Sequence, residues 1–550
     1  MKHSKKREKL RMGEIDNNPG NAKTEKQSNR ELVDRLTHEF IEKHELFQDT
    51  QKQPWIAING SGSHVMNLKE ENFRYWVMRQ AMEVNGDFIS THIADEIAKR
   101  LISIALYSSN NPRPLEVRVA RKDRIDGSPE ELWYDLCDKD GLAVHITKDG
   151  YKIEEPPIIF RRYSHQHEQV KPEAKVGGKW DDIFNIINLT ERDDRVTFTV
   201  FCLSCFVSRF PKPILLIQGT NGSGKSTPMR IIHSLIDPSE LESGTALVKD
   251  TAELARQANK LCIIHWDNID GREITPEVSN ALCRLASGQA FMRRTLYQDD
   301  ADSIFKGQRA IMLNGIGRLV EREDILDRSL IITTQRIPEN KRKTEATIFS
   351  KLREMKPYLL HEVFMALSKA LTIYPTINLE SSHRMADFEA LGYAICEALD
   401  GYSGKEWLEV YDRVVKRQVE NALEESATAQ IAKYLVDRSR NHYWEGTASM
   451  MREFQFGDDD FYIESDEDNA LKEQIKENPS FPRNATALGI QLNRAESTLR
   501  SLGIEVEHSN SKHSIYKNGS RWITLRATDG YEADEKLRDG MDDWENSLPF

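Results

Sequence analysis

The segment Ile214-Leu-Leu-Ile-Gln-Gly-Thr-Asn-Gly-Ser-Gly-Lys-Ser-Thr227 joins an apolar strand to the pattern Gly219-x-x-x-x-Gly224-Lys225-Ser226. A polyphosphate needs many hydrogen-bond donors and little side-chain bulk around it. Glycines let backbone N–H groups wrap a phosphate at the N-terminus of a helix, Lys225 adds a positive charge, and Ser226 can ligate Mg²⁺. We therefore predict a nucleotide site with these binding residues: Gly219, Thr220, Asn221, Gly222, Ser223, Gly224, Lys225, Ser226 and Thr227.

The composition is that of a large soluble protein with several domains. Of 550 residues, 39% are hydrophobic and 30% are charged, and the net charge is −12. A nucleic-acid partner would therefore have to meet local basic patches. The longest apolar run, residues 196–207, is shorter than the ~20 residues of a membrane span. We expect no membrane segment, no secretory signal, and a cytoplasmic protein whose six scattered cysteines are reduced.

Strands and helices alternate around the glycine loop. Apolar segments that predict strands lie at 214–218, 261–266, 310–313 and 329–334, with predicted helices between them. This rhythm is typical of an α/β fold with a doubly wound parallel sheet, which binds ligands at the carboxyl ends of its strands.

Polar side chains flank three of these strands. Asp267 follows the second strand and can hold Mg²⁺ through water beside Ser226. Asn314 follows the third strand, where an amide can orient a water molecule that attacks the terminal phosphate. Arg328 precedes the fourth strand and could reach a phosphate bound by a neighbouring subunit. Each signal is weak alone, but all four in this order predict an ATP hydrolase that uses ATP and Mg²⁺.

Together these residues resemble the P-loop AAA+ ATPase core of superfamily 3 helicases, most closely those of prophages, phages and plasmids related to the poxvirus-type primase-helicases. The resemblance rests on the glycine loop, Asp267-Asn268, Ala281-Leu-Cys-Arg-Leu-Ala-Ser-Gly288, Arg293-Arg294-Thr-Leu-Tyr297, Leu313-Asn-Gly-Ile316, Leu326-Asp-Arg-Ser329 and Arg384-Met-Ala-Asp-Phe388. It implies a homo-oligomeric ring, usually a hexamer, that hydrolyses ATP at subunit junctions and moves along single-stranded DNA.

The resemblance also implies a role for each residue. Lys225 binds phosphate, Ser226 and Asp267 hold Mg²⁺, Asn314 is the sensor, and Arg328 is the finger that acts on a neighbouring subunit. The segment with Arg293, Arg294 and Tyr297 corresponds to the loop that holds DNA in the pore of the ring. An exposed arginine pair without that role is the alternative.

One position departs from the pattern of this family. Ring ATPases of this kind usually carry a second acid after the strand-ending aspartate, and this acid is the base that polarises water. Here the position is Asn268, which cannot accept a proton. Either Asp267 or Asp270 takes that role, or hydrolysis is slow and the protein is a switch rather than a motor.

We divide the chain into six parts. Residues 1–30 are predicted to be a disordered basic tail, 31–180 an α+β accessory domain, 181–375 the ATPase core, 376–440 a helical lid or connector, 441–527 a winged-helix DNA-binding domain, and 528–550 an acidic disordered tail.

The accessory domain has no recognisable catalytic set. Its predicted elements are helices at 31–45, 73–82 and 93–107 and short strands at 115–120, 132–137, 142–146, 151–153 and 158–162. Asp135, Asp138 and Asp140 fit turn carboxylates better than metal ligands. The basic group around Arg161 and Arg162 either meets phosphate or is a solvated surface.

Three helices at 444–454, 485–494 and 495–502, followed by strands at 504–507, 514–516 and 522–525, predict the winged helix. Its third helix would enter a DNA groove, and its basic hairpin would lie along phosphate. Such domains also dock proteins, so the partner stays open. The candidate DNA contacts are Arg494, Arg500, Lys512, Lys517 and Arg521.

Acidic residues dominate two segments. Residues 458–468 hold seven acids and no bases, which predicts a solvated loop. The chain closes with Asp542-Asp543-Trp-Glu-Asn-Ser-Leu-Pro-Phe550, which is similar to the acidic tips of bacterial single-stranded DNA-binding proteins. This tip docks on a replication-protein partner, folds back on a basic channel of its own chain, or is a plain disordered tail.

Two functional hypotheses follow. The first is an ATP-driven DNA helicase or translocase of a mobile genetic element. The second is a DNA-binding ATP switch with slow turnover, for replication initiation or anti-phage defence. A small-molecule kinase would share the glycine loop, but it does not need Asn314, Arg328 or a winged helix.

Overall fold

The computed structural model describes residues 19–60, 64–107, 112–289, 291–294, 302–305, 308–315, 323–326, 328–379, 383–456, 465–509, 522–529 and 531. The chain divides into two compact units. The first consists of Met1–Ala120, Trp133–His145 and Lys152–Gln169, and the second of Arg121–Leu132, Ile146–Tyr151 and Val170–Phe550. Within the described ranges, no helix combines the length and apolarity that crossing a membrane requires.

Helices and a small antiparallel sheet begin the first unit. The helices are α1 (Pro19–Lys43), α2 (Glu71–Asn85) and α3 (Thr91–Tyr107), and the sheet has the order β1 (Glu45–Gln48), β2 (Pro54–Ala57), β3 (Val65–Asn67). Apolar residues at helical spacing, such as Ile93, Ile97 and Leu101 of α3, are buried in one core. The helix α1 starts at Pro19, so part of the segment expected to be disordered is helical.

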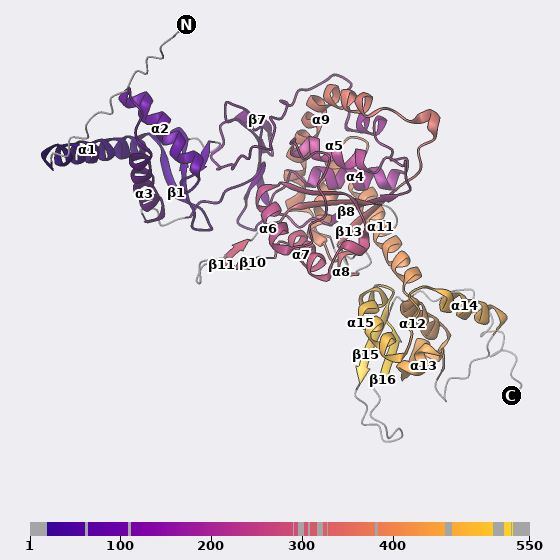
Figure 1. Ribbon diagram of the computed structural model, residues 1–550. Helices are drawn as coiled ribbons and strands as arrows, with labels where there is room; N and C mark the ends of the chain where they lie inside the picture. The colour runs from indigo at the N-terminus through magenta and orange to yellow at the C-terminus, as the bar shows by residue number, and fades with distance from the viewer. Residues whose placement is uncertain are drawn as a thin grey trace, which may run out of the picture. The chain divides into compact units, whose positions relative to one another are not determined.

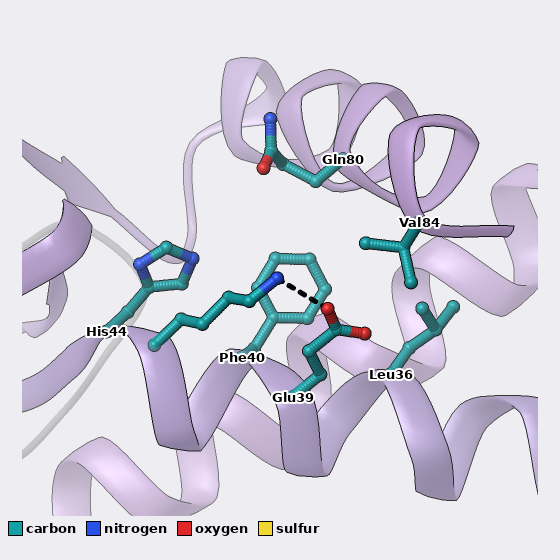
Figure 2. Close-up of a pocket in the computed structure, with 7 residues that line it drawn as sticks. Leu36, Glu39, Phe40, His44, Gln80 and Val84 are labelled. Carbon is teal, nitrogen blue, oxygen red and sulfur yellow. Dashed lines mark hydrogen bonds and ion pairs between the residues drawn. The ribbon is translucent and has the colours of Figure 1, made fainter.

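Figure 2 shows a small pocket between α1 and α2 of this unit. Leu36, Phe40 and Val84 line its apolar side, and Lys43 pairs with Glu39 at its rim, with a distance of 2.5 Å between Nζ and Oε1. His44 in its wall accepts a hydrogen bond from the backbone of Asn59 at 2.9 Å. Burial lowers the pKa of His44, so this side chain serves as a neutral packing and hydrogen-bonding group.

A four-stranded sheet has the order β4 (Val119–Asp123), β5 (Pro129–Asp135), β6 (Ala143–Thr147), β7 (Gly150–Glu154). The strand expected at 115–120 begins only at Val119. The strand expected at 158–162 was wrong, because that segment contributes only an isolated bridge between Phe160 and Glu116.

Within the basic group of the first unit, Arg162 is bound to a buried carboxylate. Arg162 donates from Nε and Nη2 to the carboxylate of Asp135, at 2.9 and 2.6 Å, and the Asp135 side chain is only 3% exposed. Asp135 and Asp138 also accept backbone N–H bonds within the turn between β5 and β6, as expected of turn carboxylates. Arg162 is therefore a partner of the turn rather than a solvated cation or a phosphate ligand.

The second unit contains a four-stranded parallel sheet with the order β13-β8-β12-β9. Its strands are β8 (Ile214–Gly219), β9 (Ile263–Ile269), β12 (Ala310–Gly315) and β13 (Ser329–Thr334), and each was expected from an apolar run. Such runs fit strands buried on both faces. In Figure 1, α4 (Arg192–Ser204), α5 (Ser226–Ile236) and α9 (Glu345–Ile373) cover one face, and α6 (Thr251–Lys260), α7 (Pro276–Ser287) and α8 (Glu323–Leu326) cover the other. This is the expected mixed α/β arrangement.

Shorter elements complete this region. A 3₁₀ turn (Trp180–Asn185) and a loop precede α4. Strands β10 (Phe291–Arg294) and β11 (Asp302–Phe305) form an antiparallel pair. The other 3₁₀ turns are Ile58–Gly60, Gly271–Glu273, Glu339–Lys341, Tyr374–Thr376 and Arg440–His442.

Two further helices follow: α10 (Ala386–Ala398) packs against α4 and α9, and α11 (Gly404–Glu425) packs against α4 and α10. Two bidentate ion pairs, Arg192 with Glu406 and Arg413 with Asp193, join α4 to α11 at distances of 2.7 to 2.9 Å. Gln418 of α11 donates to the backbone carbonyl of Ser329 at 2.7 Å. The helix α11 is thereby fixed to the first residue of β13.

The C-terminal region combines helices with a three-stranded antiparallel sheet of order β14-β16-β15. Its elements are α12 (Ala427–Arg438), β14 (Tyr443–Thr447), α13 (Ala448–Arg452), α14 (Asp466–Glu477), α15 (Ala485–Ser501), β15 (Ile504–Ser509) and β16 (Trp522–Ala527). They enclose one core that includes Trp444, Leu488, Leu499 and Leu525.

Three local expectations here were wrong. The helix expected from Trp444 starts as strand β14, because Trp444 and Gly446 are buried and alternate with exposed residues. The two helices expected at 485–502 are one helix, since no helix breaker separates them. The end of the acidic segment starts α14, where Ser465 and Asp468 form a capping box and Asp468 pairs with buried Arg438.

The buried pair of the first unit gives a stability prediction. We expect Asp135→Ala to lower the free energy of opening of β5 and β6 by about 3 kcal/mol, because it leaves Arg162 without its carboxylate. Hydrogen exchange of these strands in the full chain measures the effect. The control Asp140→Ala removes an exposed carboxylate and should change it by less than about 0.5 kcal/mol. Equal effects of the two variants would contradict the assignment.

Candidate nucleotide-binding site

The glycine loop leaves β8 at Gly219 and enters α5 at Ser226. Gly222 and Gly224 have φ angles of 77° and 78°, a region that favours glycine. A Cβ atom at Gly219 would lie 2.5 Å from the backbone oxygen of Thr334, at the end of the neighbouring strand β13. The loop can therefore follow this path only with glycine at these three positions.

Hydrogen bonds from outside the loop fix its course. Asn188 donates from Nδ2 to the carbonyl of Ser223 at 2.9 Å and to that of Gln335 at 2.7 Å. The backbone N–H of Ile337 donates to the carbonyl of Gly222 at 3.3 Å. The loop is thus joined both to the residues before α4 and to the segment after β13.

The side chain of Lys225 folds back onto the glycine loop. Its Nζ donates to the carbonyls of Gly219 and Thr220 at 2.9 and 3.1 Å. Burial lowers the pKa of Lys225, and the negative charge of Asp267 acts against this change. A phosphate that accepted a hydrogen bond from the Lys225 ammonium would replace these two carbonyl contacts with a charge-assisted bond.

Asp267 meets Ser226 and Asn314 at the carboxyl ends of three adjacent strands. Ser226 Oγ donates to Asp267 Oδ1 at 2.8 Å, and Asn314 Nδ2 donates to the same Oδ1. Asn314 Nδ2 is also 3.4 Å from Ser226 Oγ. The sheet order explains why these three side chains lie together, because β12 lies between β8 and β9.

These oxygens fit a magnesium ion. Ser226 Oγ and Asp267 Oδ1 are joined by a hydrogen bond of 2.8 Å, and both are oxygen donors of the kind that Mg²⁺ prefers, Ser226 directly and Asp267 through water. Among the described residues, no group of three or more histidines, cysteines or acids could hold a metal by itself. An ion here would therefore also need oxygens from phosphate and water, which is how Mg²⁺ usually binds beside a nucleotide.

A bulge in β9 places Asn268 beside this group. Leu313 pairs with Trp266 and Gly315 with Ile269, so two residues of β9 oppose Asn314 alone. Asn268 takes a φ of 54°, its side chain is exposed, and its N–H donates to Asn314 Oδ1 at 2.7 Å. Asn314, which is 1% exposed, is thus held at both ends of its amide.

His265 lies on β9 just before Asp267. It is 2% exposed, and neither ring nitrogen has a hydrogen-bond partner among the described residues. Burial lowers its pKa to about 3, so the ring stays neutral at physiological pH. His265 therefore packs as an uncharged ring beneath the site.

Arg328 lies at the opposite edge of the sheet. Ser329 pairs with Ile214 and Thr334 with Gly219, so β13 runs parallel to β8 over its whole length. Six residues of strand, about 20 Å, separate Arg328 from the level of the glycine loop. The structure brings together Lys225, Ser226, Asp267, Asn268 and Asn314, but it does not bring Arg328 to them within one chain.

The DNA-contact candidates are placed only in part. Arg494 and Arg500 are exposed on α15, and Arg500 pairs with Glu496 at 2.7 Å. Arg293 and Arg294 lie on β10, opposite Ser303 and Asp302 of β11, without a description of their side chains. Outside the described residues lie Tyr297, Lys512, Lys517 and Arg521, the strand expected at 514–516 and the acidic end of the chain.

Asn188 and Ile337 are parts of the site that the sequence did not predict. Their partners Ser223 and Gly222 are far away in the chain, and neither residue belongs to a motif. His265 carried a weak signal, because it stands in an otherwise apolar strand where a histidine must be neutral.

Two family models match the chain. Residues 180–419, which include the parallel sheet and the glycine loop, match the model of the actinomycete integrative conjugative element replication protein. Residues 463–536 match the model of the AICE RepA C-terminal domain. Together these matches identify a replication protein of a conjugative element. The second match covers α14, α15, β15 and β16 of this replication protein.

Solved structures titled as the apo NrS-1 C-terminal region are similar over most of the replication protein. Three of them cover 90% of this chain and 98 to 99% of their own chains. Their sequence identities are 14%, 15% and 12%, and their TM-scores are 0.40, 0.39 and 0.37. Values this low say nothing about ligands or chemistry. No curated protein matched the sequence.

The Asn314 amide gives a prediction about charge. Asn314→Asp would set two carboxylates side by side and raise the pKa of one of them in the folded state. A carboxyl whose pKa is raised in the folded state stabilises the fold at low pH, and this contribution is lost as the pH rises. We therefore expect the largest loss of unfolding free energy at pH 8, about 1–3 kcal/mol, and a smaller loss near pH 5. Millimolar Mg²⁺ should restore much of the loss at pH 8.

Thermal unfolding of the full chain at both pH values, with and without Mg²⁺, checks this prediction. Asn340→Asp is the matched control, because it adds the same charge on an exposed turn. A loss in Asn314→Asp that is independent of pH and Mg²⁺ would show that the amide has no electrostatic role beside Asp267.

Proposed function

We propose that this replication protein is an ATP-driven DNA helicase or translocase with a P-loop AAA+ core, which acts as a ring on single-stranded DNA. The observation that carries the proposal is the contact of Ser226, Asp267 and Asn314 beside the glycine loop. A switch or a motor of this kind needs a phosphate cradle, a metal ligand and a group that senses the terminal phosphate, and these residues have the corresponding chemistry.

The described side chains suggest how hydrolysis would proceed. Lys225 and the backbone N–H groups of the loop would bind the phosphates of ATP, and Ser226 with Asp267 would hold Mg²⁺. The ion, when bound, would neutralise charge that builds up on the phosphate oxygens. Asn314 would keep the Asp267 carboxylate in place through Nδ2. Water that reached the terminal phosphate would lie next to this amide.

Ring assembly is supported by the place of Arg328. An arginine at the far edge of the sheet cannot contact a nucleotide bound by its own chain, but it could contact a nucleotide bound by a neighbouring copy. An arginine supplied in this way stabilises charge in phosphoryl transfer. Gln418 fixes the backbone of Ser329, the next residue, so α11 would transmit movements to this arginine.

We infer that the C-terminal region is a winged helix that contacts DNA. In support, α12, α14, α15 and the sheet β14-β16-β15 share one core, and α15 exposes Arg494 and Arg500. A helix with exposed cations can enter a groove of DNA. The β10-β11 pair, with Arg293 and Arg294, would supply a second contact with DNA inside the ring.

A second candidate function is a DNA-binding ATP switch that turns over slowly and does not unwind. Asn268 favours it, because the bulge places an exposed amide at the position where such ATPases usually carry the proton-accepting acid. An amide cannot accept that proton. Nucleotide binding would then mainly control assembly on DNA during replication initiation.

An ATPase assay with and without single-stranded DNA tests the proposed motor. We expect hydrolysis that single-stranded DNA stimulates, and a loss of about a hundredfold in Lys225→Ala, because the phosphate loses its only loop cation. Lys260→Ala removes an exposed lysine from the end of α6 and should leave the rate unchanged. ATPase activity that persists in Lys225→Ala would refute the site.

Unwinding of a forked DNA duplex separates the two candidates. The motor displaces a strand when ATP is added. The switch binds ATP and assembles but leaves the duplex intact, and Asn268→Asp should raise its rate of hydrolysis.

A further inference from the structure

Arg342 lies against the glycine loop at Gly222. A Cβ atom at Gly222 would be 3.3 Å from Nη2 and 4.0 Å from Cζ of Arg342. The guanidinium therefore lies beside Gly222, one of the loop glycines that have a left-handed backbone. Arg342 itself lies in the segment that leads from β13 to α9.

This segment is tied to the loop on both sides of Arg342. Ile337 donates to the carbonyl of Gly222, and Gln335 accepts a bond from Asn188, which also holds Ser223. On the other side, Lys343 donates from Nζ to the carbonyl of Asn185 at 2.6 Å. The position of Arg342 is thus set by the same contacts that set the course of the glycine loop.

The guanidinium keeps most of its hydrogen-bonding capacity. Its Nε is 3.3 Å from the carbonyl oxygen of Ile337, and in the described part of the chain no carboxylate pairs with it. The two Nη groups can therefore donate two parallel hydrogen bonds, and two oxygens of a phosphate can accept them. An exposed side chain of this kind can also turn toward a ligand at little cost.

Charge in the loop points the same way. A nucleoside triphosphate carries several negative charges, whereas residues 219–227 of the loop offer only one cationic side chain, Lys225. A second cation from the same chain would balance the phosphate chain without any neighbouring subunit. Arg342 is within reach of the loop, unlike Arg328.

We propose that Arg342 is a second phosphate-binding cation of the nucleotide site, supplied by the same chain. It contacts the phosphate chain of the bound nucleoside triphosphate from the side of Gly222. This inference rests on the proposed nucleotide site, and it gives the segment after β13 a direct part in binding.

Equilibrium dialysis of labelled ATP with the full chain, in Mg²⁺, tests the proposal. Because a charge-assisted bond is lost, Arg342→Ala should weaken ATP binding about tenfold or more, and Arg342→Lys should restore part of the loss. The matched control is Arg336→Ala, which removes an exposed arginine from the same segment and should leave binding unchanged. The thermal unfolding of all three variants without nucleotide should equal that of the wild type.

The outcomes are distinct. If Arg342→Ala binds ATP as tightly as Arg336→Ala while Lys225→Ala has lost binding, the nucleotide site stands and the role of Arg342 is refuted. A wild-type chain that binds no ATP refutes both. A structural role would lower both the unfolding temperature and the ATP affinity of Arg342→Ala, and Arg342→Lys would not restore the affinity. That result would overturn the inference.

Discussion

The buried amide of Asn314 holds the candidate site together. Its Nδ2 donates to Asp267 and its Oδ1 accepts from the backbone of Asn268, so one side chain fixes both residues at the end of β9. This is possible only because β12 lies between β8 and β9 in a parallel sheet, which brings three carboxyl ends to one edge. A buried amide that loses its hydrogen bonds costs stability, so the strand order and the site support each other.

The same sheet separates two parts of the proposed reaction. The glycine loop lies at the carboxyl edge and Arg328 at the amino edge, on adjacent strands with a fixed register. No rotation of a side chain can close a gap as long as a strand. A site that uses both residues must therefore be completed by a second copy of the chain, whereas Lys225 and Arg342 belong to one copy. Binding and hydrolysis could then depend on assembly to different degrees.

Sequence reasoning found those parts of the site that sit in local patterns. The glycine loop, Asp267 and Asn314 each follow an apolar strand, and the spacing of the strands gave the α/β class. The bulge at Asn268, the bonds from Asn188 and the place of Arg342 depend on residues far apart in the chain, for which no local pattern exists. Likewise, strand β14 was mistaken for a helix because its alternation spans only five residues, and Arg162 was not recognised as the partner of Asp135.

Mixing two inactive variants tests the completion of the site by a neighbour most directly. Lys225→Ala lacks the loop cation, and Arg328→Ala lacks the arginine at the far edge, so each alone should hydrolyse ATP poorly. In a mixture, some junctions pair an intact loop from one copy with an intact Arg328 from the other. The account predicts that the mixture regains ATPase activity in the presence of single-stranded DNA. A mixture no more active than its two components, although the copies assemble together, would contradict it.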